Sequence, residues 1–194
     1  MLDKEIYDIM KKNYWKFWSW AIRREETGKP TSNTDDMSWV DPNLYKNINT
    51  WYVFVWLNLS STHWDKWCND DIAWSNFHSG YSHQQDFKLR YALKGTDYWG
   101  SYITDIIKNL KEVDSNKVDS YLKRHPEIVL ENIKFFKKEI SYLWNNLKLV
   151  ALGSKSYRLL NKYLWNEYEI IKIKHYACRM WKERYRKEVL SSLK

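Results

Sequence analysis

Cysteine, proline and glycine are all scarce in this chain of 194 residues, which has two, three and five of them. Two cysteines, Cys68 and Cys178, are too few for a zinc or iron–sulfur site built from cysteine alone. We expect both to be reduced thiols, and a disulfide between them stays open. No run of about 18 uncharged apolar residues is present, so the sequence offers no candidate for a membrane-spanning helix. The first residues also lack the layout of a secretory signal peptide, which predicts a cytoplasmic protein.

Positive charge and aromatic rings are abundant instead. Lysine and arginine number 32 against 24 acidic residues, for a net charge of +8, and the basic residues concentrate near both ends of the chain. This imbalance favours polyanionic partners, although many basic proteins bind no nucleic acid. The 13 tryptophans and 15 tyrosines exceed what a core of this size needs. We expect most of them to pack in the interior, and some of them to be able to stack on bases.

Four short apolar runs predict the fold. Each is partly β-branched and ends in a polar residue or a glycine, as a buried parallel strand does when its carboxyl end opens onto a site. Between and after them, helical patterns appear. This alternation predicts an α/β protein: a three-layer α/β/α sandwich around a four-stranded parallel sheet, with strand order 2-1-3-4. The predicted strands are 53–60, 98–106, 147–152 and 169–174, and the predicted helices are 117–123, 126–143, 180–193 and one that opens at 153–156.

The remaining segments are predicted from their composition. Apolar residues at helical spacing over 3–26 indicate an amphipathic helix packed on the sheet, with a helix lying on a membrane surface as the alternative. Residues 27–42 hold turn formers and read as a polar loop. The segment 60–93 is long, irregular and rich in tryptophan, histidine and asparagine, which is typical of a functional loop with short helices. We expect one domain over 1–194, with 1–48 packed on it.

Polar side chains follow three of the predicted strands. Asn58, Asp105 and His175 each stand at or near a strand's carboxyl end, where open α/β sheets place their ligands. We therefore expect these three side chains to converge at one edge of the sheet.

The order of these motifs resembles the uracil-DNA glycosylase superfamily over about residues 50–190. Tyr102-Ile103-Thr104-Asp105-Ile106-Ile107-Lys108 is similar to a family strand that reads Y-I-T-N-V-V-K in several branches. Leu149-Val150-Ala151-Leu152-Gly153 is similar to the family's V-V-A-L-G, and Phe77-His78-Ser79-Gly80 resembles its P-F-x-G. Val55-Trp56-Leu57-Asn58-Leu59-Ser60 stands where the family has its first motif, and His175-Tyr176 stands where most branches have His-Pro.

The chain also departs from the family pattern. Trp56 and Leu59 replace the glycine and the proline of the first motif, and Tyr176 replaces the proline after the histidine. The cysteines that bind an iron–sulfur cluster in some branches are absent. The resemblance is therefore to a divergent member without the cluster.

The resemblance implies a monofunctional DNA glycosylase that needs no metal and no cofactor. Asn58 would position the attacking water, and His175 would donate a hydrogen bond to the base oxygen at position two. Phe77 would stack on the flipped base, Asp105 would bind its pairing edge, and Leu57 would line the pocket beside them. A carboxylate only accepts hydrogen bonds, so Asp105 suits an exocyclic amine better than the O4 of uracil. The alternative is that Asp105 braces Lys108 and contacts no base.

DNA is the partner that this reading implies, bound by a monomer that would be nucleoid-associated in the cell. The candidates for contacts with phosphates are basic, and the candidates for a wedge that fills the space left by the flipped base are apolar. The phosphate-facing candidates are Lys155, Lys174, Arg179, Lys182 and Arg184, and the wedge candidates are Tyr176 and Met180.

Two other function classes stay open. The first is a catalytically inactive descendant of the glycosylase fold that binds DNA or a protein, which the altered first motif makes credible. The second is an unrelated α/β enzyme such as a nucleotide hydrolase, with Gly153-Ser154-Lys155-Ser156 as its phosphate site. Lys155 and Ser156 match the end of a P-loop, but Leu149 and Ser154 stand where its two glycines belong.

Overall fold

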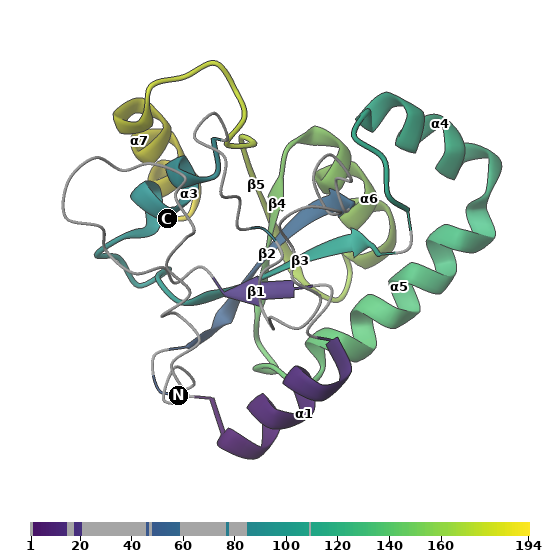
Figure 1. Ribbon diagram of the computed structural model, residues 1–194, viewed down its shortest axis with the longest axis horizontal. Coiled ribbons are helices and arrows are strands. Elements are labelled where there is room, and N and C mark those ends of the chain that lie inside the picture. The colour runs from purple at the N-terminus through teal and green to yellow at the C-terminus, as the bar shows by residue number, and fades with distance from the viewer. Residues whose placement is uncertain are drawn as a thin grey trace, which may run out of the picture.

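The computed structural model describes residues 2–14, 18–20, 46, 48–58, 77, 85–108 and 110–194. A twisted five-stranded sheet forms the middle of the molecule (Figure 1). Its strand order is β1-β3-β2-β4-β5, and the four strands from β3 to β5 are parallel, which confirms the predicted order 2-1-3-4. The strands are β1 (Trp18–Trp20), β2 (Asn49–Asn58), β3 (Ser101–Ile107), β4 (Lys148–Leu152) and β5 (Glu169–Ile173).

Helices cover both faces of this sheet. One face carries α1, α4, α5 and α6, and the other carries α3 and α7, which lie side by side at the upper left of Figure 1. Each layer has its own hydrophobic core, so the predicted three-layer α/β/α arrangement is confirmed. The helices are α1 (Lys4–Tyr14), α3 (Phe87–Leu93), α4 (Ser115–Arg124), α5 (Pro126–Ile140), α6 (Ser154–Leu164) and α7 (Lys182–Ser192). Within the described ranges, no helix is long and apolar enough to cross a membrane.

The N-terminal segment corrects one prediction. The helix expected over 3–26 ends at Tyr14, and 18–20 form the edge strand β1, which pairs antiparallel with β3. The aromatic residues at 15, 17, 18 and 20 favour a strand as well as they fit a helical stripe. Pairing with the open edge of β3 then decides the outcome, because tertiary contacts override weak local propensity. The predicted loop 27–42 lies outside the described residues.

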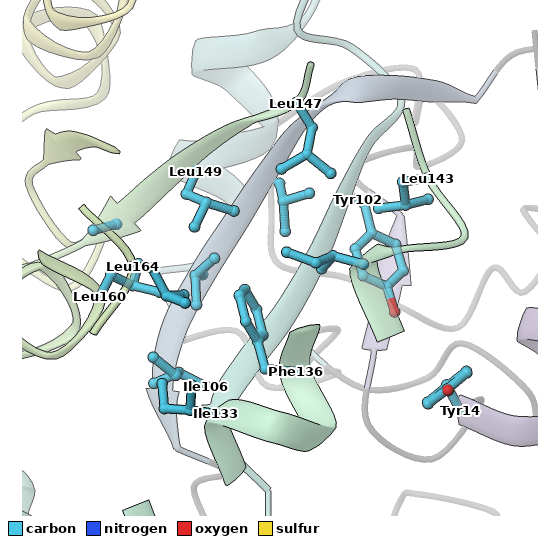
Figure 2. Close-up of a cluster of buried hydrophobic side chains, with 14 of the residues drawn as sticks. Tyr14, Tyr102, Ile106, Ile133, Phe136, Leu143, Leu147, Leu149, Leu160 and Leu164 are labelled. Carbon is cyan, nitrogen blue, oxygen red and sulfur yellow. The ribbon is translucent and has the colours of Figure 1, made fainter. Parts of the chain in front are cut away.

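The larger core lies between the sheet and the layer of α1, α5 and α6. Phe136 and Ile133 of α5 point toward the sheet and share one core with Tyr102 and Ile106 of β3 and Leu149 of β4 (Figure 2). Leu160 and Leu164 of α6 close the same core from the side. Burying one such side chain stabilises the fold by roughly 1.5–3 kcal/mol, so this layer supplies much of the stability.

A buried polar network crosses the same interface from β3 to α5. Lys108, which follows β3, is 3% exposed, and its Nζ lies 2.7 Å from Oε2 of Glu139 of α5, which is fully buried. The other carboxylate oxygen of Glu139 accepts hydrogen bonds from the hydroxyls of Tyr102 (2.5 Å) and Thr104 (2.7 Å). Burial and the nearby Glu139 raise the pKa of Tyr102 well above its usual range, so its hydroxyl stays a donor. The ion pair and these hydrogen bonds together offset the free-energy cost of burying both charges in the core.

Local signals set the ends of several helices. Asp114 caps α4 by accepting a hydrogen bond from the backbone N–H of Asn116 at 2.8 Å, and Pro126 opens α5. Helix α6 begins after Gly153, whose φ of +90° is a conformation that favours glycine. The turn that the sequence indicated at Gly153 is therefore present, as is the short helix α3 within the irregular segment 60–93.

Candidate functional site

The carboxyl ends of β2, β4 and β5 meet at one edge of the sheet. Val55 pairs with Ala151, and Ala151 pairs with Lys172. The residues three positions after Val55, Ala151 and Lys172 are Asn58, Ser154 and His175. Asn58 and His175 therefore stand at the same level along the strands. Only β4 separates their strands, which places the two backbones roughly 10 Å apart. The strand ends that carry Asn58 and His175 therefore lie at one edge of the sheet, and the convergence of the three side chains stays a prediction.

Asn58 is the last residue of β2, and its amide has a fixed orientation. Nδ2 donates to the backbone oxygens of Leu110 (3.1 Å) and Glu112 (2.8 Å), in the segment between β3 and α4. Both amide hydrogens are used in these bonds, so a water at this residue would be held by Oδ1, an acceptor with two lone pairs. The same bonds tie the end of β2 to the segment after β3, which is a structural role for Asn58 in its own right.

His175 follows β5 and is held as a neutral imidazole. Burial lowers its pKa from 6.5 to about 4. The backbone N–H of Ala177 donates to Nδ1 at 3.2 Å, so Nδ1 is an acceptor and the ring proton sits on Nε2. The edge of the sheet thus carries an uncharged donor, the Nε2–H of His175.

The turn that holds this imidazole is anchored from α3. Cys178 N–H donates to the backbone oxygen of His175 at 3.0 Å, and Cys178 O accepts from Met180 N–H at 2.8 Å. Lys88 of α3, only 6% exposed, donates from Nζ to the same Cys178 oxygen at 3.0 Å. The connection from β5 to α7, drawn in yellow at the top of Figure 1, is therefore fixed to the helix beneath it.

Aromatic rings line the sheet beside His175. Trp56 lies 4.8 Å from the ring of Phe77 and 5.9 Å from that of Tyr176, and Tyr176 lies 4.4 Å from His175, all between ring centroids. Phe77 has a φ of +67°, which costs energy in a bulky residue and is seen mostly at functional sites and tight turns. Such a cluster suits a flat ligand that binds by stacking.

Asp105 lies on the same face of the sheet as this cluster. It is the pairing partner of Trp56 in the neighbouring strand, and it is 2% exposed. Lys108 Nζ does bind Asp105, at 2.6 Å, but through the backbone oxygen. The bracing of Lys108 therefore uses the backbone oxygen of Asp105, and contact with a base through its side chain stays a prediction.

Leu57 corrects a prediction about the pocket. Its side chain packs against the core cluster of α1, α5 and α6, whereas Trp56 and Phe77 belong to the cluster of α3 and α7. Successive side chains of a strand point to opposite faces, so Leu57 lies on the far side of the sheet from Phe77 and Asp105. It does not line a pocket with them.

Most of the predicted phosphate contacts are engaged within the chain. Lys155 donates to Ser115 Oγ (2.8 Å) and Asn116 Oδ1 (2.7 Å) at the start of α4. Lys174 and Arg184 both pair with Glu188, at 2.7 Å and 3.3 Å. The remaining two differ from each other: Lys182 lies 4.9 Å above the ring of Tyr91, whereas Arg179 is exposed and forms no ion pair with any described residue.

The predicted wedge residues are not the most exposed apolar ones. Tyr176 and Met180 are half-buried and pack against the core cluster of α3 and α7. Trp181, at the start of α7, is 84% exposed and follows them directly. In the sequence nothing distinguishes Trp181 from the other tryptophans, because exposure depends on how the loop sits on α3.

The turn at Gly153 has the contacts of a packing turn. Gly153 N–H donates to Ile173 O at 2.9 Å, and Ser156 Oγ, which is 1% exposed, donates to Val55 O at 2.7 Å. A P-loop would direct its lysine and its last serine at phosphate and metal, whereas Lys155 and Ser156 here bind the chain itself. This arrangement disfavours the nucleotide hydrolase.

The chemistry available at this edge is hydrogen bonding and stacking. Among the described residues, no group of three or more His, Cys, Asp and Glu side chains is placed to hold a metal ion. Comparisons with protein-family models, with curated proteins and with solved structures find no match to this chain.

Proposed function

We propose that this protein hydrolyses the N-glycosidic bond of an altered base that is flipped out of DNA. The observation that carries the proposal is the neutral His175, with its proton on Nε2, beside an aromatic cluster at the carboxyl edge of the sheet. Asn58 at the same level of that edge supports it.

The proposed chemistry needs a donor for a leaving base. When the glycosidic bond breaks, the sugar gains oxocarbenium character and a pyrimidine leaves as an anion with charge on its O2. A neutral imidazole with a pKa of about 4 donates a hydrogen bond from Nε2 to that oxygen and stays neutral before the reaction. The donor is already oriented by Ala177 N–H, so little reorganisation is needed as the charge develops.

Water is the nucleophile in this proposal, and Asn58 holds it through Oδ1. An amide is not a general base, so Asn58 accelerates the removal of a proton from this water less than a carboxylate would. We therefore expect a slow enzyme, in which stabilisation of the leaving base and distortion of the bound nucleotide contribute most of the rate.

In this proposal the base is recognised by stacking on an aromatic ring and by a hydrogen bond to one carboxylate. Phe77 stacks on the base, and Asp105 accepts from its pairing edge. Extruding a nucleotide costs a few kcal/mol, which contacts with the DNA backbone offset. Arg179 supplies one such contact. Trp181 fills the vacated stack, because it is 84% exposed whereas Tyr176 and Met180 pack against the core cluster of α3 and α7.

The test is base release from oligonucleotides that each carry one lesion, in single-stranded and duplex form. The wild-type protein should release at least one base, and Asn58→Ala and His175→Gln should each lower kcat on the order of a hundredfold or more with DNA affinity nearly intact. Lys138→Ala, an exposed change on α5, is the control and should leave the rate unchanged. Release from no lesion, or variants as fast as the wild type, would contradict the proposal.

One observation favours a second candidate function. Asn58 already donates twice to backbone oxygens, which gives it a structural task without catalysis. A glycosylase-fold protein that only binds DNA would keep Asn58 for this reason. Tight binding of the same oligonucleotides, with no base released from any of them, would select this candidate.

A further inference from the structure

One buried donor at the candidate site is unused. Trp56 is 6% exposed, and its indole N–H has no hydrogen-bond partner among the described residues. A buried N–H that is left unsatisfied destabilises the folded state, and nearly all such groups in folded proteins have an acceptor. A phenylalanine would fill much of the same space without this cost. The unused N–H is therefore open to an acceptor that none of the described residues supplies.

The surroundings of Trp56 indicate what that acceptor belongs to. Two rings contact it, Phe77 at 4.8 Å and Tyr176 at 5.9 Å between centroids, and His175 adjoins Tyr176. A ligand bound at Trp56 would therefore contact aromatic side chains, which favours a flat, unsaturated ring. An indole N–H donates along the plane of its own ring, so the accepting atom of the ligand must lie in the plane of the Trp56 indole.

Asp105 adds a second polar group of opposite character. It pairs with Trp56 across β2 and β3, so their side chains leave the same face of the sheet next to each other. The indole N–H only donates and an ionised carboxylate only accepts. Side by side, they match a ring edge on which a carbonyl or ring nitrogen stands next to an amine.

We infer that Trp56 is a specificity-determining residue that donates from Nε1 to the ring of the bound base, and that Trp56 and Asp105 together select a cytosine-type edge. The inference rests on the proposed function and names the substrate class for it. In cytosine and its modified forms, the exocyclic amine donates to Asp105 and an in-plane acceptor next to it takes the indole proton. Uracil offers O4 where cytosine has its amine, so a carboxylate rejects it.

The variant that isolates this contact is Trp56→Phe, which keeps an aromatic ring and removes the N–H. Its matched control is Trp51→Phe, because Trp51 lies on the same strand but is 52% exposed and stacks on Trp144 near the opposite end of β2. We expect kcat/KM on cytosine-derived lesions to fall about tenfold or more in Trp56→Phe, with the rate on a uracil lesion changed far less. Trp51→Phe should behave as the wild type.

A second readout does not depend on catalysis. In ¹H–¹⁵N spectra of the wild-type protein, the Trp56 indole signal should move downfield when free cytosine or 5-methylcytosine is added, and uracil should leave it in place. Failure of base release together with this shift would remove the proposed reaction and keep the binding site. No movement of the Trp56 signal with any base, or equal loss on all lesions in Trp56→Phe, would overturn the inference. If Trp56→Phe does not fold, the titration of the wild type still decides the question.

Discussion

At the scale of single residues, His175 links the candidate chemistry to stability. Its pKa is about 4 in the fold against 6.5 for an exposed histidine, so the unfolded chain takes up a proton at a higher pH than the folded one. Stability from this group is complete above pH 6.5 and is lost as the pH falls toward 4. At pH 5 we expect a loss on the order of 1–2 kcal/mol in the free energy of unfolding.

That loss is measured by urea unfolding at pH 7 and pH 5. His175→Gln lacks the titrating group, so its free energy of unfolding should fall by less over the same interval. The difference between the two proteins removes the contribution of the other four histidines. Parallel pH profiles for the wild type and His175→Gln would show that His175 is protonated normally in the fold.

In the proposed function, Asp105 decides which edge of the base is accepted. Asp105→Asn replaces an acceptor by a group that also donates, so the O4 of uracil gains a partner. We expect the ratio of rates on uracil and cytosine-derived lesions to move toward uracil, by about 1–3 kcal/mol for one well-placed contact. Both lesions are assayed with both proteins in the same sequence context. An unchanged ratio would place Asp105 outside the reading of the base.

At the scale of secondary-structure elements, β3 and α5 are joined by charge as well as by apolar packing. Lys108→Met leaves the carboxylate of Glu139 buried without its cation, which we expect to cost about 3–5 kcal/mol. Lys108→Met combined with Glu139→Leu should cost less than the sum of the two single changes, because no lone charge remains. Urea unfolding of the three variants gives the coupling. On the surface pair Lys148–Glu169, the matched change Lys148→Met should have little measurable effect.

The elements also show where a single sequence is informative. The strands β2 to β5 were predictable because their apolar, β-branched runs are short and end in polar residues or glycine. The end of α1 was not, since the aromatic run at 15–20 satisfies a helical stripe and a strand equally. Leu57 was assigned to the wrong face for a related reason: all positions from 53 to 57 are apolar, so the pattern does not reveal which side chains share a face.

The site was predictable in its place but not in its details. The strand-end position of Asn58 and His175 follows from the pattern of the sheet. The turn that puts Ala177 N–H on Nδ1 is anchored by the buried Lys88, and this contact joins residues 90 positions apart in the chain. The unused N–H of Trp56 is likewise a property of packing, since in the sequence Trp56 stands only as a departure from a motif.

At the scale of the whole molecule, the two faces of the sheet have different tasks. The layer of α1, α5 and α6 holds the larger core and the Lys108–Glu139 network. The face of α3 and α7 carries Trp56, Phe77 and Tyr176. Changes in the first layer should therefore act through stability, and changes on the second face should act through binding and rate.

The net charge of +8 predicts DNA binding that weakens steeply with salt, because each phosphate contact adds nearly one to the slope of log affinity against log salt. Arg179→Ala removes one exposed cation and should lower that slope by nearly one.

Glu188→Gln should act in the opposite direction from Arg179→Ala. Lys174 holds the pKa of Glu188 below its usual range, and losing this carboxylate releases both Lys174 and Arg184 toward phosphates. We expect tighter binding and a slope that rises by up to about two. Fluorescence anisotropy on one labelled oligonucleotide at several salt concentrations measures all three proteins. An affinity that stays flat with salt in the wild type would point to an uncharged partner, and a weaker Glu188→Gln would mean that Lys174 and Arg184 serve only to hold α7 in place.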